Sequence, residues 1–227
     1  MNVCLIPAAG FGKRVGEPPA KELLIDPENQ RPLIDWSLQL AIDLGLKPVV
    51  ITRESKTSLR AYLDEYWHSR GVKVHLVSHS KEWPDSVLQS EVLWGPINLM
   101  LLPDTRFEPM SLVKQLIHDC ENDKDASFGF FRTIERLDTW GVLDWSASRT
   151  LKICEKPKTL PRISSPQDKM APWGLISFKK EVGKNLFSDL LGSNQSHDWF
   201  EFRNSYSLHE LNSFRDITRK SSDLELK

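Results

Sequence analysis

The sequence has little cysteine, and this scarcity excludes two classes of small stabilised domain. Three cysteines occur among 227 residues, and Cys4, Cys120 and Cys154 are widely spaced, each beside apolar residues. An odd and dispersed set does not suit a disulfide framework or a zinc site. We therefore expect the chain to work in a reducing compartment, the cytoplasm.

The sequence also lacks an excess of either charge and any long hydrophobic run. Its 30 basic and 31 acidic residues leave a formal net charge of −1. Without an overall field, no binding to nucleic acid or to an anionic membrane is expected, and a phosphate ligand would need a local site. No stretch reaches the roughly 20 apolar residues of a membrane span, and the amino terminus lacks the basic start of a signal peptide. We expect a soluble, unprocessed protein.

Short β-branched runs alternate with helical patterns through the first half of the chain. This alternation predicts an α/β fold with a Rossmann-like, doubly wound, mainly parallel mixed sheet. From Ala126 the pattern changes to strands and turns, and we expect loops at Lys156 to Pro172 and at His197-Asp198. The predicted strands are Val3–Ala8, Pro48–Ile51, Val72–Val77 and Asn98–Leu102. The predicted helices are Pro32–Leu44, a helix that Ser55 caps and whose apolar stripe ends at Tyr66, Asp85–Leu93, and a helix that begins at Pro109.

Two glycines and two cations follow the first predicted strand, in the run Ala8-Ala9-Gly10-Phe11-Gly12-Lys13-Arg14. Glycine lets the main chain turn sharply and bring its N–H groups against phosphate oxygens, while the cations offset the negative charge. The run is neither a Rossmann fingerprint, which needs a third glycine, nor a Walker loop, which needs Gly-Lys-Ser/Thr. It predicts a phosphate cradle, with a tight turn and solvated cations as the alternative.

The glycine run, together with Pro18-Pro19-Ala20-Lys21-Glu22-Leu23-Leu24, resembles the signature of the sugar nucleotidyltransferases, in the form found in glucose-1-phosphate uridylyltransferases and thymidylyltransferases. The resemblance implies a fold of the nucleotide-diphospho-sugar transferase type with a sugar-side lobe. It also implies that Arg14 and Lys21 hold the triphosphate and stabilise the charge of the leaving pyrophosphate. The implied nucleotide-binding residues of this loop are Ala8, Ala9, Gly10, Gly12 and Arg14.

Three further segments of the resemblance concern the base and the metal. Asp85-Ser86-Val87-Leu88-Gln89 resembles the family's Asp-Gly-Leu-Ala-Gln segment, which implies that Ser86 and Gln89 bind nucleotide, with Ser86 in place of a glycine near the base. Asp104 follows a predicted strand as the family's Mg²⁺-binding aspartate does, with capping of a turn as the alternative. Asp216 resembles the second metal-binding aspartate, although the family's following glycine is absent, and an ordinary surface aspartate is the alternative.

The second half carries the acceptor side of the resemblance. Trp140-Gly141-Val142-Leu143-Asp144 resembles the family's Tyr-Gly-Val-Val-Glu, and Ile153-Cys154-Glu155-Lys156-Pro157-Lys158 resembles its Glu-Glu-Lys-Pro. This implies that Gly141 and Glu155 contact sugar hydroxyls and that Lys156 meets the sugar phosphate. Trp173 stands in the family's Thr-Gly-Leu segment, where it either narrows the sugar pocket or packs in the core. Packing is the favoured interpretation, because tryptophan is mostly buried.

The resemblance implies one domain over residues 1–227, with a nucleotide-binding half (1–125) and a sugar-binding half (126–227). The implied enzyme is a Mg²⁺-dependent sugar-1-phosphate nucleotidyltransferase, which joins a nucleoside triphosphate to a sugar 1-phosphate and releases pyrophosphate. Two alternatives stay open. A cytidylyltransferase acting on a non-sugar alcohol phosphate shares the Pro-Ala-Ala-Gly loop, and a non-catalytic sensor of nucleotide or nucleotide sugar would explain Ser86 and the altered Asp216 segment.

Overall fold

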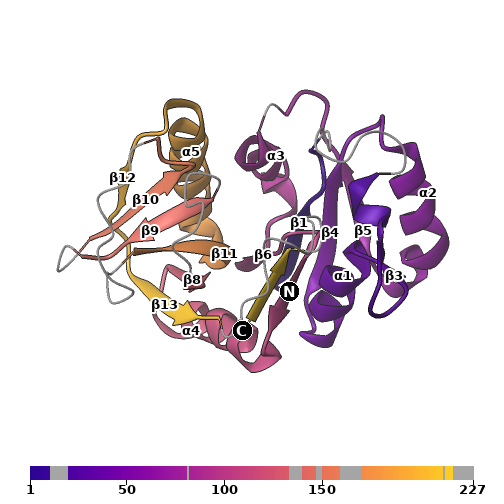
Figure 1. Ribbon diagram of the computed structural model, residues 1–227, viewed down its shortest axis with the longest axis horizontal. Coiled ribbons are helices and arrows are strands. Elements are labelled where there is room, and N and C mark those ends of the chain that lie inside the picture. Colours follow the sequence, from indigo (N-terminus) through magenta and orange to yellow (C-terminus); the bar gives the residue numbers. More distant parts are fainter. Residues whose placement is uncertain are drawn as a thin grey trace.

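The computed structural model describes residues 1–10, 20–80, 82–132, 140–146, 150–158, 170–211 and 213–216, and Figure 1 shows their arrangement. The strands are β1 (Val3–Pro7), β2 (Ile25–Asp26), β3 (Arg31–Pro32), β4 (Lys47–Thr52), β5 (Lys73–Leu76), β6 (Ile97–Met100), β7 (Thr105–Glu108), β8 (Ala126–Phe130), β9 (Gly141–Asp144), β10 (Leu151–Glu155), β11 (Met170–Lys179), β12 (Phe200–Phe202), β13 (Tyr206–Glu210) and β14 (Ser213–Asp216). The α-helices are α1 (Ile34–Asp43), α2 (Thr57–Tyr66), α3 (Trp83–Gln89), α4 (Met110–Asn122) and α5 (Lys180–Ser196), and the 3₁₀ turns are η1 (Lys21–Leu23), η2 (His68–Arg70) and η3 (Glu91–Leu93).

A ten-stranded sheet runs through both halves of the chain, in the order β12-β10-β9-β11-β6-β1-β4-β5, with β8 and β13 branching from β11. Strands β5, β4, β1 and β6 are parallel, as the first half predicted, whereas β11, β9, β10 and β12 pair antiparallel. The predicted α/β, doubly wound fold is therefore confirmed. The chain leaves β1 toward β4 on one side and later returns to β6 on the other, so the strand order reverses between β1 and β6.

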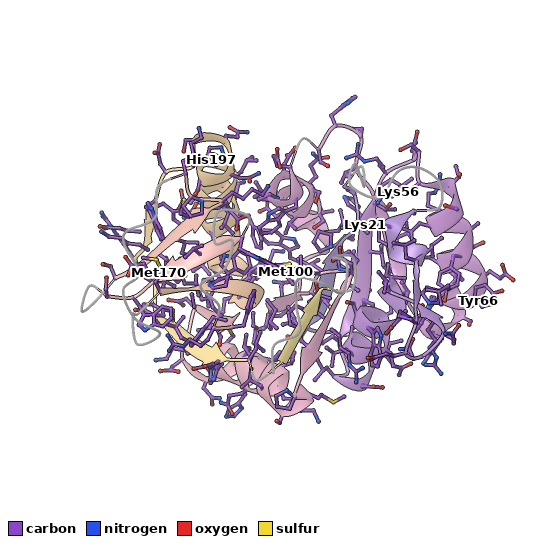
Figure 2. All side chains as sticks on the ribbon, viewed as in Figure 1. Lys21, Lys56, Tyr66, Met100, Met170 and His197 are labelled. Carbon is purple, nitrogen blue, oxygen red and sulfur yellow. The ribbon has the colours of Figure 1, made fainter. Side chains whose placement is uncertain are left out.

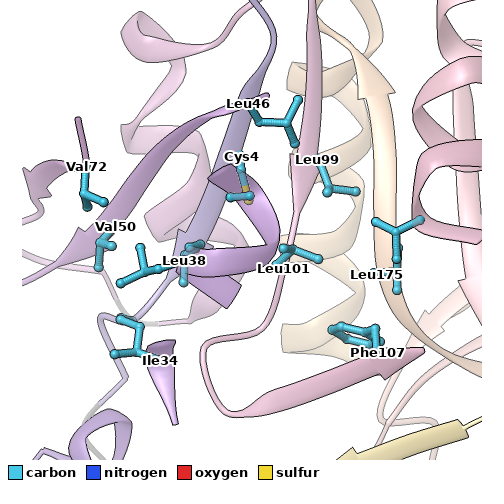
Figure 3. Packing of buried hydrophobic residues seen from close by; sticks show 14 of the residues in the cluster. Cys4, Ile34, Leu38, Leu46, Val50, Val72, Leu99, Leu101, Phe107 and Leu175 are labelled. Atoms are coloured by element: carbon cyan, nitrogen blue, oxygen red, sulfur yellow. The ribbon is translucent and has the colours of Figure 1, made fainter. Parts of the chain in front are cut away.

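Helices cover both faces of this sheet. On β1, Cys4 and Ile6 enter a cluster with α1, α2 and α4, while Val3 and Leu5 enter a second cluster with α3 and α5. Figure 3 shows the first cluster, in which Leu38 of α1 lies beside Cys4 and Val50. This alternation explains why Val3 to Pro7 is apolar throughout, since a strand covered on both faces has no solvent side.

Several local expectations are wrong. Lys56 rather than Ser55 is the N-cap residue of α2, and it makes no side-chain capping bond. Tyr66 lies at the end of the apolar stripe but is 55% exposed. Helix α5 fills 180–196, where the sequence pattern predicted only strands and turns. Residues 170–172 of the predicted loop belong to β11, where Met170, Ala171 and Pro172 pair with β9; the loop's residues 159–169 lie outside the described part.

Helix α5 packs closely against the second apolar cluster at a glycine. A Cβ on Gly183 would lie 2.5 Å from Trp94 Cζ3 and 2.6 Å from Phe178 Cε2. Gly192, in the same helix, has no described atom within 4 Å of that position. Among the described helices, none is both long enough and apolar enough to cross a membrane.

The two glycines of α5 should respond to alanine in opposite directions. Gly183→Ala should lower the free energy of unfolding by about 1–3 kcal/mol, because rigid aromatic rings occupy the space of the new methyl group. Gly192→Ala should raise it by about 0.5–1 kcal/mol, because alanine loses less backbone entropy in a helix. Urea denaturation of the two variants and the parent decides this, and equal effects would contradict the packing described here.

Candidate functional site

The carboxyl ends of β1 and β6 lie side by side at the point where the strand order reverses. In open α/β sheets, ligands bind at this edge, next to such a switch point. Ala8 and Ala9 follow β1 and are buried, whereas Gly10 is exposed, and no described atom lies within 4 Å of the place where its Cβ would stand. Gly12 and Arg14 fall outside the described residues.

Lys21 and Asp104 meet at this edge. Lys21 opens η1 and Asp104 follows β6, and Lys21 Nζ lies 2.7 Å from Asp104 Oδ2. Their side chains are 26% and 13% exposed, so both charges remain accessible to a ligand while they pair with each other. Two residues that the sequence separates by 83 positions thus form one charged site.

A buried ion pair anchors the turn that carries Lys21. Glu22 is fully buried, and its two carboxylate oxygens accept hydrogen bonds from Lys56 Nζ at 2.7 and 2.9 Å. Burial lowers the pKa of Lys56, and the charges of nearby Lys21 and Arg53 act in the same direction, against the opposing effect of Glu22. Lys21 and Lys56 lie on the same side of the molecule in Figure 2. The edge therefore gathers the cations Lys21, Arg53 and Lys56, of which Lys56 pairs with Glu22 and Lys21 pairs with Asp104.

Arg53 makes two contacts at this edge that the sequence did not predict. It directly follows β4, and its Nε donates to the carbonyl oxygen of Ala9 at 2.6 Å, while its Nη2 donates to the carbonyl oxygen of Ser80 at 3.2 Å. The guanidinium therefore joins the start of the glycine run to the segment that leads into α3. Because these contacts join residues far apart in sequence, no local motif indicated them.

The two predicted base-side residues lie on α3. Ser86 is buried, and its hydroxyl donates to the carbonyl oxygen of Trp83 at 2.7 Å within the same helix. The Gln89 side chain is exposed and donates to Asp85 Oδ1 at 3.2 Å. The hydroxyl of Ser86 is thus occupied by the helix itself.

Asp216 comes back to the same edge through the last described strand. On β14, Asp216 is the Cα partner of Thr105, the residue after Asp104, although the Asp216 side chain is not among those described. No group of three or more His, Cys, Asp or Glu side chains in the described ranges suits a metal ion. Mg²⁺ needs fewer protein ligands, because one or two carboxylates and substrate phosphates usually suffice, and Asp104 is a carboxylate of the kind that this ion prefers.

A second cluster forms in the later half around Gly141, Glu155 and Trp173. These residues come from the adjacent strands β9, β10 and β11. A Cβ on Gly141 would lie 2.2 Å from Glu155 Oε1 and 2.3 Å from Trp173 Nε1, so only glycine lets both side chains cross here. Glu155 Oε2 accepts a hydrogen bond from Trp83 Nε1 of α3 at 3.4 Å. The Trp83 bond joins this cluster to the first half of the chain.

Glu155 is a buried carboxyl with an altered proton affinity. Burial raises the pKa of Glu155 to about 7, against the opposing effects of the Lys156 charge and the Trp83 hydrogen bond. Near neutral pH this group therefore exists in both charge states. A carboxyl of this kind can accept a hydrogen bond from a ligand hydroxyl when ionised and donate one when protonated.

The end of α5 fixes Lys156 in an unusual backbone conformation. Lys156 has φ 53°, a region that non-glycine residues rarely adopt. Its Nζ donates to Asn194 Oδ1 at 3.2 Å, and its carbonyl oxygen accepts from His197 Nδ1 at 2.9 Å. The backbone N–H of Glu155 donates to Ser193 Oγ at 2.9 Å. His197 was predicted in a solvated loop and is instead a half-buried helix-capping residue, and this corner was missed because α5 itself was missed.

The raised pKa of Glu155 predicts a pH-dependent stability difference. The folded chain holds this proton more tightly than the unfolded chain, so wild-type stability should fall as pH rises from about 4.5 to about 7. Glu155→Gln removes this penalty, and the variant should gain about 1–3 kcal/mol relative to wild type between pH 4.5 and pH 8. Denaturant titrations at both pH values measure the difference, and a gap that stays constant with pH would contradict it.

Comparison with known proteins gives structural matches only. No protein-family model matches the sequence, and no curated protein sequence matches it either. A Bacillus anthracis protein assigned as a glucose-1-phosphate thymidylyltransferase, solved with sucrose, superposes with a TM-score of 0.70 over 95% of this chain and 89% of its own, at 16% identity. A UTP-bound UGPase and a UDP-glucose pyrophosphorylase, both from Acinetobacter baumannii, give TM-scores of 0.68 and 0.67 over 96% of this chain and 88% of theirs, at 18% identity. The chain therefore has the fold of the sugar nucleotidyltransferases.

Proposed function

We propose that this protein is a sugar-1-phosphate nucleotidyltransferase, which joins a nucleoside triphosphate to a sugar 1-phosphate and releases pyrophosphate. The observation that carries the proposal is the Lys21–Asp104 pair, 2.7 Å apart, with Asp104 beyond β6 at the switch point of the sheet. A cation and a carboxylate are charged groups that a metal-bound triphosphate requires. The shared fold with solved enzymes of this class supports the same reaction type.

The reaction follows from the chemistry of its two substrates. An oxygen of the sugar phosphate attacks the α-phosphorus in line, a new P–O bond forms, and the bond to the leaving pyrophosphate breaks. Both substrates bring their own nucleophile or leaving group, so no covalent bond to the protein is needed. The protein contributes position and charge neutralisation, which are the main sources of catalysis in phosphoryl transfer.

The first half supplies the charge for this step. Lys21 exchanges its contact with Asp104 for the triphosphate and offsets the charge of the departing pyrophosphate, with Arg14 in the same role. Asp104 and Asp216 would hold Mg²⁺, which neutralises charge shared by the phosphates of both substrates when bound. Arg53 fixes the carbonyl of Ala9 and so the direction in which the glycine run leaves β1.

The second half binds the acceptor. Glu155, next to Gly141, is suited to a sugar hydroxyl, and Lys156 is suited to the sugar phosphate as a compact cation. The bond between Trp83 and Glu155 connects this half to α3, the helix that carries Ser86 and Gln89. The two halves therefore divide the substrates between them.

A substrate panel tests the proposal. Pyrophosphate release is measured for each common nucleoside triphosphate paired with sugar 1-phosphates and with alcohol phosphates, in Mg²⁺ and in chelator. Mg²⁺-dependent release with a sugar 1-phosphate, lost in a folded Asp104→Asn variant, is the expected result. Release only with an alcohol phosphate favours the cytidylyltransferase class, and nucleotide binding without any release favours the sensor.

Lys21 should matter for turnover far more than for folding. Lys21→Ala is expected to lower kcat by about 10²-fold or more, because it removes a preorganised charge at the reacting phosphate. Lys114→Ala, an exposed lysine on α4, is the matched control and should keep the parent rate. Steady-state kinetics on variants of verified thermal stability provide the comparison. A Lys21→Ala rate near that of Lys114→Ala would remove Lys21 from the catalytic residues.

A further inference from the structure

We propose that the indole N–H of Trp173 selects the acceptor substrate. It donates a hydrogen bond to a sugar hydroxyl, and that hydroxyl in turn donates a hydrogen bond to Glu155. This inference rests on the proposed function and names the chemical group that the acceptor must present. Trp173 would then be a specificity-determining residue and not only part of the core.

Trp173 carries a buried donor with nothing to receive it. The residue is 5% exposed, and its Nε1 has no hydrogen-bond partner among the described residues. A buried unpaired donor is costly, and native proteins satisfy most such groups. By contrast, the indole N–H groups of Trp83 and Trp94 find acceptors in Glu155 and Ser90. The unpaired donor at Trp173 therefore points to an oxygen that a ligand brings.

A β-bulge sets the direction of this side chain. The pairing of β11 with β8 shifts register between Trp173 and Leu175. In a regular strand these two residues would share a face, yet Leu175 packs in the cluster with α1 and α4, whereas Trp173 packs in the cluster with α3 and α5. Bulges often redirect a side chain next to an active site. Here the bulge turns Trp173 toward the strand pair that carries Gly141 and Glu155.

The glycine at position 141 lets the Trp173 donor and the Glu155 acceptor approach the same place. Trp173 Nε1 and Glu155 Oε1 lie 2.3 and 2.2 Å from the same Cβ position, and no hydrogen bond joins them in the described structure. Glu155 Oε2 is occupied by Trp83, which leaves Oε1 for a ligand. A hydroxyl group both accepts and donates, so one sugar hydroxyl satisfies both atoms, whereas a hydrogen at that sugar carbon satisfies neither.

The decisive variant is Trp173→Phe, which keeps an aromatic ring and removes the N–H. With the most active sugar 1-phosphate of the panel, kcat/KM for the sugar should fall about 10- to 100-fold, because one substrate hydrogen bond is lost. The KM for the triphosphate should not change. Trp94→Phe is the matched control, because it shortens another buried tryptophan of the same cluster, and it should keep the parent kcat/KM.

Monodeoxy analogues of that sugar 1-phosphate identify the hydroxyl. Wild type should discriminate against one analogue by about 10- to 100-fold, and Trp173→Phe should lose most of that discrimination, as a double-mutant cycle requires for two groups in contact.

In thermal unfolding, Trp173→Phe should be less destabilised than Trp94→Phe, because it removes an unpaired donor whereas Trp94→Phe leaves Ser90 without its donor.

The outcomes separate this inference from the proposed function. Turnover in wild type with unchanged analogue discrimination in a folded Trp173→Phe would overturn the role of Trp173 alone. If wild type releases no pyrophosphate with any pair, the proposed function fails, and calorimetric titration of the sugar 1-phosphates then tests the binding role directly. Equal affinity of wild type and Trp173→Phe in that titration would overturn the inference as well.

Discussion

Burial of both faces of the sheet decides where this chain can hold functional groups. Side chains of β1 alternate between two apolar clusters, Cys4 and Ile6 in one and Val3 and Leu5 in the other, and helices cover both. A polar group in the middle of such a strand loses its water and therefore needs a partner within the protein, as Asn98 of β6 finds in the backbone of Gly95. The groups that meet at the switch point therefore follow the strands: Ala8 directly follows β1, Arg53 directly follows β4, and Asp104 lies beyond the end of β6. The groups of the second cluster, Glu155 and Trp173, lie within β10 and β11 instead.

The sequence alone predicted the parts of the fold and of the candidate site that depend on residues close together in the chain. A continuous apolar run identified β1, because a strand covered on both faces has no polar alternation, and short β-branched runs indicated β4 and β5. The Lys21 and Asp104 motifs were visible because each follows a short local signature, and the structure joins them. Arg53 and the α5 corner were not predictable in this way, because their partners are distant in sequence. Helix α5 was missed because its two glycines and its Ser and Asn residues weaken a helical pattern that tertiary packing nevertheless stabilises.

The acceptor-side cluster departs from several local rules at once. Lys156 adopts a positive φ immediately before a proline, Glu155 is a buried carboxyl, and Trp173 has an unpaired N–H. Each feature costs free energy, and such costs persist only where surrounding contacts enforce them. Ser193, Asn194 and His197 of the α5 end provide that enforcement. Coincidence of several unfavourable features at one place is typical of binding sites, where a ligand completes interactions that the fold leaves open.

The two carboxylates of the candidate site differ in surroundings, and the difference suits the different roles proposed for them. Asp104 pairs with the cation of Lys21, and the two side chains are 13% and 26% exposed. Glu155 lies in apolar surroundings between two tryptophans, where burial raises the pKa to about 7 and disfavours a full charge. In the proposed reaction, Asp104 is the carboxylate that would hold a metal ion, because it already pairs with a cation. Glu155 is better suited to a neutral hydroxyl, because a hydrogen bond needs no permanent charge and tolerates either protonation state.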